Sequence, residues 1–174
     1  MFYQKSLKQI PFFVFKELEE IPGFIHAFTS RQTDTVMIDA EGSGEVAAEK
    51  QLLLQTMGLK LSQLVFLHQV HSDRVVTLNS SPANDSGPIE VGPADGVITA
   101  HPIQFPVIRT ADCLPILVIL PEQRQVCALH AGWRGTRDRI TVQGVAKFLK
   151  MTEASPQQLV AAIGPCIRKC CYEV

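Results

Sequence analysis

Residues 115–129 read Pro-Ile-Leu-Val-Ile-Leu-Pro-Glu-Gln-Arg-Gln-Val-Cys-Ala-Leu, two short apolar runs separated by polar residues. Short runs rich in Val, Ile and Leu are typical of buried strands. We therefore predict strands at 115–120 and 125–129, the second of which arrives at His130. The next apolar residues recur at helical spacing and predict a helix at about 137–150. Its expected apolar face consists of Ile140, Val145, Phe148 and Leu149.

Working outward from this stretch, other segments rich in Val, Leu, Ile and Phe predict further strands. These strands are expected at 64–70, 73–78, 95–99, 106–110 and 159–163. A helix is expected at 45–58, ending at Gly58, and Ser155-Pro156 should open a short helical turn. The Ser-, Pro- and Gly-rich stretch at 80–94 is predicted to be a loop. This succession favours the α+β class, with mixed β-sheets packed with flanking helices, in one domain spanning 1–174.

The composition excludes several classes of protein. The chain has 174 residues, of which 46% are hydrophobic and 19% charged, as expected of a folded domain and not of a disordered tail. Its net charge of −1 provides no field that would recruit nucleic acid or an anionic membrane. No signal peptide or membrane-spanning run is evident, and an odd count of five cysteines does not form a disulfide framework. We therefore expect a cytoplasmic enzyme; the oligomeric state cannot be read from the sequence.

Three polar segments, at 68–74, 109–113 and 130–136, each adjoin an apolar strand. Each segment offers one good zinc donor, namely His71, Cys113 and His130. Strand ends present side chains into shared pockets, and three protein ligands leave one tetrahedral position for water, which is typical of catalytic zinc.

Strand alternation helps to choose among the donors. In an extended chain His68 and His71 face opposite sides, so at most one of them enters a pocket, and His71 lies nearer the turn. Val126, Ala128 and His130 share one face, and so do Arg109, Ala111 and Cys113 if that segment is extended. The second set would place the Arg109 guanidinium beside the metal.

Spacing alone leaves other interpretations open. An isolated histidine on a strand is more often a core or surface residue than a ligand, and Cys113 and Cys127 can each be small buried hydrophobic residues. Three more cysteines, Cys166, Cys170 and Cys171, could form a second metal site, but their spacing matches no zinc pattern that we can support.

At these same segments the sequence resembles the proteins first labelled multicopper polyphenol oxidases, or laccases, and now regarded as purine nucleoside phosphorylase and adenosine deaminase enzymes. The resemblance covers about residues 64–174. The matching motifs are His-Gln-Val-His-Ser-Asp-Arg-Val at 68–75, Ala-Asp-Gly-Val-Ile-Thr at 94–99, Thr-Ala-Asp-Cys-Leu-Pro at 110–115, His-Ala-Gly-Trp-Arg-Gly-Thr at 130–136, and Ile-Gly-Pro-Cys-Ile with Cys-Tyr-Glu-Val near the end.

The resemblance implies that His71, Cys113 and His130 bind zinc. It also implies phosphorolysis of adenosine, inosine and methylthioadenosine, and deamination of adenosine. The sequence departs from the family pattern at 28–33, where a Gly-Gly-containing segment is usual. The chain also ends at Val174 inside a motif that normally continues, so we expect a catalytic domain truncated at its C-terminus.

Deamination needs a proton shuttle, and Asp112 is the carboxylate nearest Cys113 in sequence. Phosphorolysis needs an anion site, for which Arg109, Arg134, Gly135 and Thr136 are candidates, because 132–136 lead into the predicted helix. Each of these roles has a structural alternative. Asp112 can instead form a structural hydrogen bond, and residues 132–136 can instead form a tight glycine turn with Arg134 exposed to solvent.

Three rival functions stay open. Cys113 can act as the nucleophile of a cysteine hydrolase with His130 as its base. Two histidines and one cysteine can also hold a single copper, although five histidines are too few for a multicopper oxidase. A non-catalytic domain that binds a metal or a partner is the third.

Overall fold

The computed structural model describes residues 1–7, 10–29, 54–79 and 87–172. Its centre is a five-stranded sheet with the strand order β11-β9-β10-β7-β5. Neighbouring strands are antiparallel except for β5 and β7, which are parallel. The bounds are β5 Val75–Leu78, β7 Gly96–Thr99, β9 Leu114–Leu120, β10 Gln125–Ala131 and β11 Val160–Ile163.

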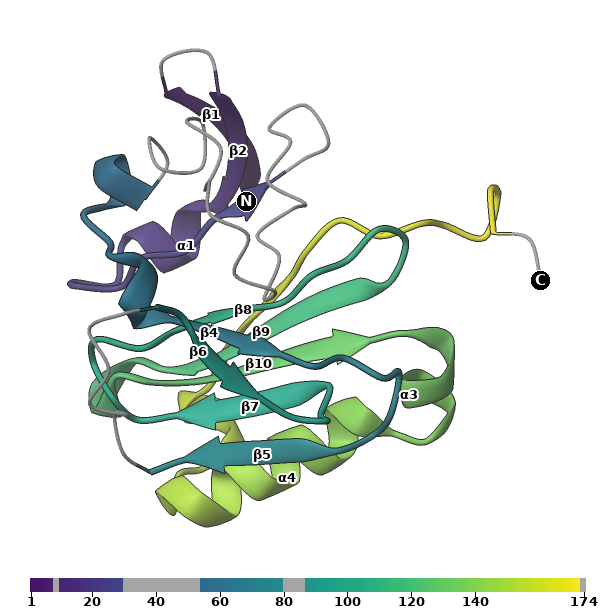
Figure 1. The fold of residues 1–174 in the computed structure, drawn as a ribbon. Helices are drawn as coiled ribbons and strands as arrows, with labels where there is room; N and C mark the ends of the chain where they lie inside the picture. The colour runs from purple at the N-terminus through teal and green to yellow at the C-terminus, as the bar shows by residue number, and fades with distance from the viewer. Residues whose placement is uncertain (8–9, 30–53, 80–86, 173–174) are drawn as a thin grey trace.

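Two smaller sheets lie against this central sheet (Figure 1). A parallel sheet of order β6-β4-β8 consists of β4 Leu64–Leu67, β6 Ile89–Val91 and β8 Phe105–Val107. An antiparallel sheet of order β1-β2-β3 consists of β1 Phe2–Leu7, β2 Ile10–Phe15 and β3 Phe28–Thr29.

The described helices are few. Helix α4, Ile140–Thr152, covers one face of the central sheet, and α3, Trp133–Arg137, links β10 to it. Helix α1, Lys16–Glu19, follows β2, and three 3-10 turns occur at Leu61–Gln63, Pro121–Gln123 and Pro156–Gln158. Among the described residues no helix is both long enough and apolar enough to cross a bilayer.

The alternation of side chains along β10 separates two hydrophobic layers. Cys127 and Leu129 are buried in a cluster with Ile140 and Phe148 of α4. Ala128, one residue away, packs on the opposite face with Val65 and its neighbours from β4. His130 has the same parity as Ala128, so it lies on the face that looks toward β4 and the loop after it.

The α+β class is confirmed, and strands β4, β5, β7, β9, β10 and β11 lie at six of the seven places where strands were expected. The expected strand at 159–163 corresponds to β11, and the Ser155 N–H donates to Gln158 Oε1 (2.8 Å) at the expected helical turn.

Three local predictions need correction. The expected loop at 80–94 contains β6, because the short apolar pair Ile89 and Val91 adds to the edge of β4 despite the surrounding Pro and Gly. The expected strand at 106–110 ends at Val107. The expected helix at 137–150 is interrupted, because Arg139 adopts left-handed backbone angles (φ 69°) between α3 and α4. Most of the helix expected at 45–58, and residues 30–33, lie outside the described residues, although 54–57 are helical and Gly58 has φ 67°.

Candidate metal centre

The strand register brings three segments that are distant in the sequence to one end of the inner strands of the central sheet. In the antiparallel pair, His130 at the end of β10 faces Pro115, and Ala131 faces Leu114 at the start of β9. Cys113 precedes Leu114, so its side chain emerges beside His130. Asp95, the residue before β7, forms backbone hydrogen bonds with both neighbouring segments. Its N–H donates to Arg74 O (3.0 Å), and its carbonyl oxygen accepts the His130 N–H (2.7 Å).

His71 lies in the loop between β4 and β5. Its backbone is left-handed (φ 61°), a conformation that non-glycine residues rarely adopt. Its N–H donates to Asp95 Oδ1 (2.9 Å), which ties this loop to the start of β7. The turn of the chain at this point, and not strand alternation, directs the imidazole of His71 toward the other two donors, while His68 is exposed.

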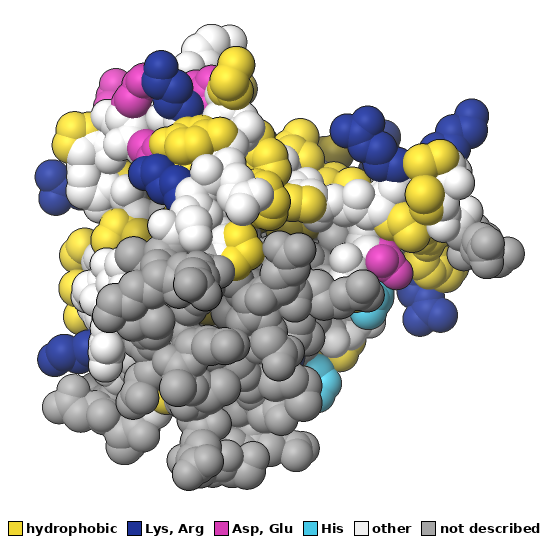
Figure 2. Space-filling view, turned by 90° about the horizontal axis from the view of Figure 1, so that it is seen from above, with side chains coloured by type: hydrophobic (Ala, Val, Ile, Leu, Met, Phe, Trp, Pro, Cys, Tyr) yellow, Lys and Arg dark blue, Asp and Glu magenta, His cyan; other side chains and the backbone are white. Residues whose placement is uncertain are grey.

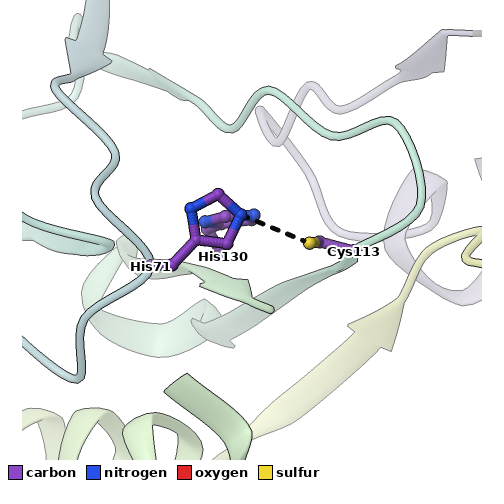
Figure 3. A group of neighbouring side chains, drawn as sticks. All are labelled: His71, Cys113 and His130. Atoms are coloured by element: carbon purple, nitrogen blue, oxygen red, sulfur yellow. Dashed lines mark hydrogen bonds between the residues drawn. The ribbon is translucent and has the colours of Figure 1, made fainter. Parts of the chain in front are cut away.

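The three donor side chains lie together (Figure 3). One ligand atom from each of His71, Cys113 and His130 lies within 4.8 Å of the others. Cys113 Sγ is 3.8 Å from His71 Nε2. The two imidazole rings meet edge to face, with centroids 4.8 Å apart and planes at 77°. His130 is buried, Cys113 is half-buried and His71 is exposed, so the group opens to solvent on one side.

Gly132 leaves the space between the donors free. A Cβ built at this residue would lie 2.8 Å from His71 Cδ2, 3.2 Å from Cys113 Sγ and 3.7 Å from His130 Cε1. Two imidazole nitrogens and one sulfur around such a space are the donors that zinc takes in catalytic sites, and they also suit a single copper. The residues present therefore fit a transition-metal ion.

Two carboxylates lie near the donors, the buried Asp95 and the exposed Asp112. Burial alone would raise the pKa of Asp95. Hydrogen bonds from the His130 ring, from the hydroxyl and N–H of Ser72, and from the His71 N–H outweigh burial and hold this pKa below its ordinary value. Burial, followed by the charges of Asp112 and Asp95, raises the pKa of the Cys113 thiol. In this negative environment a cation is favoured, and its charge would convert the thiol to a thiolate ligand.

Asp112 is exposed beside Cys113, and its carbonyl oxygen accepts the Ile167 N–H (3.0 Å). The C-terminal segment is thereby attached to the Cys113 loop. Cys170 and Cys171 lie farther along this segment, with their sulfurs 3.3 Å apart, and all three cysteines after 163 are exposed. None of these three belongs to a group of three metal donors among the described residues.

Arg109 lies in an irregular segment, because 108–113 do not continue β8. The expectation that Arg109, Ala111 and Cys113 share one face required an extended strand, and this segment does not form one. Arg109 Nη2 reaches Leu67 O (3.4 Å), and the residue lines a cavity of about 420 Å³ with His68 and Glu90. Gln69 forms two hydrogen bonds of 2.8 Å with the Arg109 backbone, joining the His71 loop to the Cys113 segment.

The residues after Gly132 form an exposed basic surface. Trp133 is 52% exposed, and the guanidinium carbons of Arg134 and Arg137 lie 5.2 and 5.5 Å from its ring centroids. Arg137 is also paired with Asp138, whereas Arg134 has no ion pair among the described residues. In the view of Figure 2, histidine side chains reach the surface, and Lys and Arg side chains project on both sides of the molecule.

Gly135 and Thr136 differ in their surroundings. Gly135 is buried, and a Cβ there would lie 2.8 Å from Ser72 O, so this glycine allows α3 to pack on the His71 loop. Thr136 is exposed and donates its N–H to Gly132 O (2.8 Å).

The sequence analysis did not identify Asp95, Gly132 or Gln69 as parts of the site. Asp95 stands in the Ala-Asp-Gly sequence before β7, and an acidic residue next to the largely apolar run Gly-Val-Ile-Thr was the available signal. The roles of Gly132 and Gln69 depend on contacts across the fold and have no local signature.

Comparison with known proteins identifies the family to which the chain is similar. A family model described as multi-copper polyphenol oxidoreductase laccase matches residues 28–174. The chain is 33% identical to a purine nucleoside phosphorylase of Haemophilus influenzae over 88% of its own length and 63% of that protein. It is 35% identical to a purine nucleoside phosphorylase of Deinococcus radiodurans over 74% of its length and 47% of that protein. The chain thus spans about half to two thirds of these relatives.

Solved structures share the fold. YlmD from Geobacillus stearothermophilus superposes with a TM-score of 0.63 at 29% identity, covering 71% of this chain and 47% of that one. YfiH from Bacillus licheniformis gives a TM-score of 0.62 at 28% identity, covering 71% and 48%.

Proposed function

We propose, from the premise that the chain belongs to the multi-copper polyphenol oxidoreductase laccase family, that it is a zinc-dependent enzyme acting on purine nucleosides. The observation that carries the proposal is the meeting of His71, Cys113 and His130 around the space that Gly132 keeps free. The printed names of the relatives, purine nucleoside phosphorylase, indicate the substrate class.

Two reactions are proposed. In phosphorolysis, a phosphate oxygen forms a bond to C1′ of the ribose, the C1′–N9 bond breaks, and its electron pair leaves with the purine, which takes up a proton. In deamination of adenosine, water adds to C6, the C6–N6 bond breaks, and nitrogen leaves as ammonia. Adenosine, inosine and methylthioadenosine are the proposed nucleosides.

His71, Cys113 and His130 would hold the zinc ion. Zinc held by three protein ligands supplies a Lewis acid and lowers the pKa of water toward about 7. His130, which is buried and fixed by Asp95, provides the rigid side of the site, and exposed His71 provides its open side. Asp112, exposed beside Cys113, is the proposed group that transfers protons to and from the substrate.

Phosphate requires positive charge that is not already neutralised. Arg134 meets this condition among the described residues, and Arg109 adds a second guanidinium next to the His71 loop. The Thr136 hydroxyl and the Gly135 backbone are the remaining proposed contacts. Bidentate hydrogen bonds from Arg match the geometry of phosphate oxygens.

A cysteine hydrolase is the second candidate, since Cys113, His130 and Asp95 provide the residue types of a Cys-His-Asp triad. Two observations weigh against it. A second imidazole, His71, lies 3.8 Å from the sulfur, although a triad has no use for it. An activated cysteine nucleophile needs a depressed pKa, whereas burial and two carboxylates raise the pKa of Cys113.

Copper oxidation of phenols is less well supported. Several coppers need many imidazoles, but the described residues contain one group of three metal donors. His26 accepts the Phe15 N–H through Nε2 (2.8 Å), so it is engaged elsewhere in the fold.

The proposal is tested by incubating the zinc-loaded chain with inosine and phosphate, and separately with adenosine alone. We expect hypoxanthine with ribose 1-phosphate in the first case and inosine with ammonia in the second. Chelation of the metal, or Cys113→Ala, should abolish both. Activity that survives chelation but not alkylation of Cys113 would instead establish the hydrolase. A chain that holds zinc without releasing either product would contradict the enzymatic proposal.

A further inference from the structure

Asp95 is a fully buried carboxylate at the head of β7. Its oxygen Oδ1 accepts hydrogen bonds from His130 Nδ1 (2.8 Å) and from the His71 N–H (2.9 Å). Its oxygen Oδ2 accepts the Ser72 N–H (2.6 Å), the Ser72 hydroxyl (2.7 Å) and the Val70 N–H (3.2 Å). A buried carboxylate is costly unless its lone pairs are satisfied, and this one is saturated with donors.

One effect of these bonds is on the His130 ring. A carboxylate only accepts hydrogen bonds, so the ring nitrogen that faces it, Nδ1, must carry the proton. In the neutral imidazole the other nitrogen, Nε2, then keeps its lone pair. Asp95 thus selects the tautomer in which Nε2 can act as a metal ligand.

A second effect is on the loop that carries His71. Three successive backbone N–H groups, those of Val70, His71 and Ser72, converge on the same carboxylate. This arrangement opposes the steric cost of the left-handed backbone at His71 (φ 61°). The turn that directs the His71 imidazole toward Cys113 is therefore held by the group that also orients His130.

We propose that Asp95 is the positioning residue of the metal centre, fixing both of its histidines through one carboxylate. The proposal rests on the zinc site proposed above and adds to it a residue that does not itself touch the ion. Residues that orient metal ligands typically contribute about 10- to 100-fold to metal affinity. We expect a contribution in this range from Asp95, because it orients two of the three ligands.

The first test is the zinc affinity of Asp95→Asn, measured by competition with a chromophoric chelator, together with the visible spectrum of the cobalt-substituted protein. An amide at this place presents N–H groups to donors and cannot satisfy all of them. We expect zinc affinity to fall by about 10- to 100-fold and the cobalt bands to change in position and intensity. Asp138→Asn, which alters an exposed carboxylate paired with Arg137, is the matched control and should leave both readouts unchanged.

The outcomes separate this inference from the metal site itself. If the unmodified chain takes up no zinc, the metal centre is wrong. If it binds zinc through the three donors and Asp95→Asn binds equally tightly with the same cobalt spectrum, the role of Asp95 is wrong while the metal centre stands.

A second measurement needs no variant and is decisive even if Asp95→Asn does not fold. Long-range ¹H–¹⁵N spectra of the metal-free chain at about pH 8 report which nitrogen of each neutral imidazole carries the proton. We expect the proton of His130 on Nδ1 and that of the exposed His68 on Nε2, the form favoured in free histidine. A His130 ring protonated on Nε2 overturns the inference.

Discussion

Gly132 determines whether the space between the donors is available. Its backbone (φ −71°, ψ 171°) is one that any residue adopts, so Gly132→Ala introduces a methyl group without backbone strain. Because this methyl would lie 2.8 Å from His71 Cδ2, we expect zinc affinity to fall by about tenfold or more while the melting temperature changes little. Isothermal titration with zinc measures the first quantity. Gly87→Ala, where a Cβ would contact nothing within 4 Å, is the control and should bind zinc normally.

The cysteines should differ in their reactivity toward iodoacetamide. Cys127 is in the core, and burial raises its pKa to about 12, so it should stay unmodified in the native chain. Cys166 is exposed and should react with or without metal. Cys113 should react slowly in the metal-free chain and be protected by one equivalent of zinc. Peptide mapping by mass spectrometry gives the rate at each residue. Equal labelling of Cys113 with and without zinc would be incompatible with its role as a ligand.

The grouping of the three candidate donors was predictable, because His71, Cys113 and His130 are residue types that bind zinc and stand next to apolar runs in motifs of the family. The residues that position these donors, Asp95 and Gly132, were not predictable. Asp95 acts through hydrogen bonds to residues 23 to 35 positions away, and Gly132 acts through the side chain it lacks. Such roles are set by the register of β7, β9 and β10, which a single sequence does not display.

At the scale of elements, α4 stabilises the central sheet through its buried face. Phe148 is fully buried against residues of β10 and its neighbours, whereas Val142 on the same helix is 60% exposed. We expect Phe148→Ala to lower the free energy of unfolding by about 3–5 kcal/mol, and Val142→Ala to change it by no more than about 0.5 kcal/mol. Urea denaturation followed by circular dichroism measures both. Similar losses in the two variants would mean that α4 does not pack as described.

The N-terminal sheet should make stability depend on pH through His26. Burial, with a smaller contribution from Lys5, lowers the pKa of His26 to about 4, and its Nε2 accepts the Phe15 N–H. Above pH 6.5 His26 is neutral in both states and has no effect. As the pH falls from 6.5 to about 4, the unfolded chain takes up the proton first, so stability is lost over this window and no further below it.

His26→Gln isolates this effect, since the Gln oxygen can still accept the Phe15 N–H but does not titrate. The unfolding free energy of the original chain should fall relative to that of the variant between pH 6.5 and 4. Parallel curves for the two proteins across this range would show that His26 titrates alike in both states.

Elements with strong local signals were predictable, and those that depend on partners were not. The apolar runs of β9 and β10 are enough to predict these two strands from the sequence. By contrast, β6 has three residues between prolines and glycines and exists because β4 offers it an edge. The break at Arg139, which has φ 69°, separates α3 from α4 although no proline or glycine marks it in the sequence.

At the scale of the whole molecule, the candidate metal centre depends on four strands of the central sheet, β5, β7, β9 and β10. Its donors come from the loop before β5, the segment before β9 and the end of β10, and β7 with Asp95 lies between β5 and β10. No local fragment contains all of these parts. Formation of the site therefore requires the folded central sheet.

Zinc K-edge X-ray absorption of the chain loaded with one equivalent of zinc tests the central claim most directly. We expect one sulfur at about 2.3 Å and two imidazole nitrogens at about 2.0–2.1 Å, with the sulfur absent in Cys113→Ala. A first shell without sulfur, or a sulfur that persists after Cys113→Ala, would place the ion elsewhere and contradict the account.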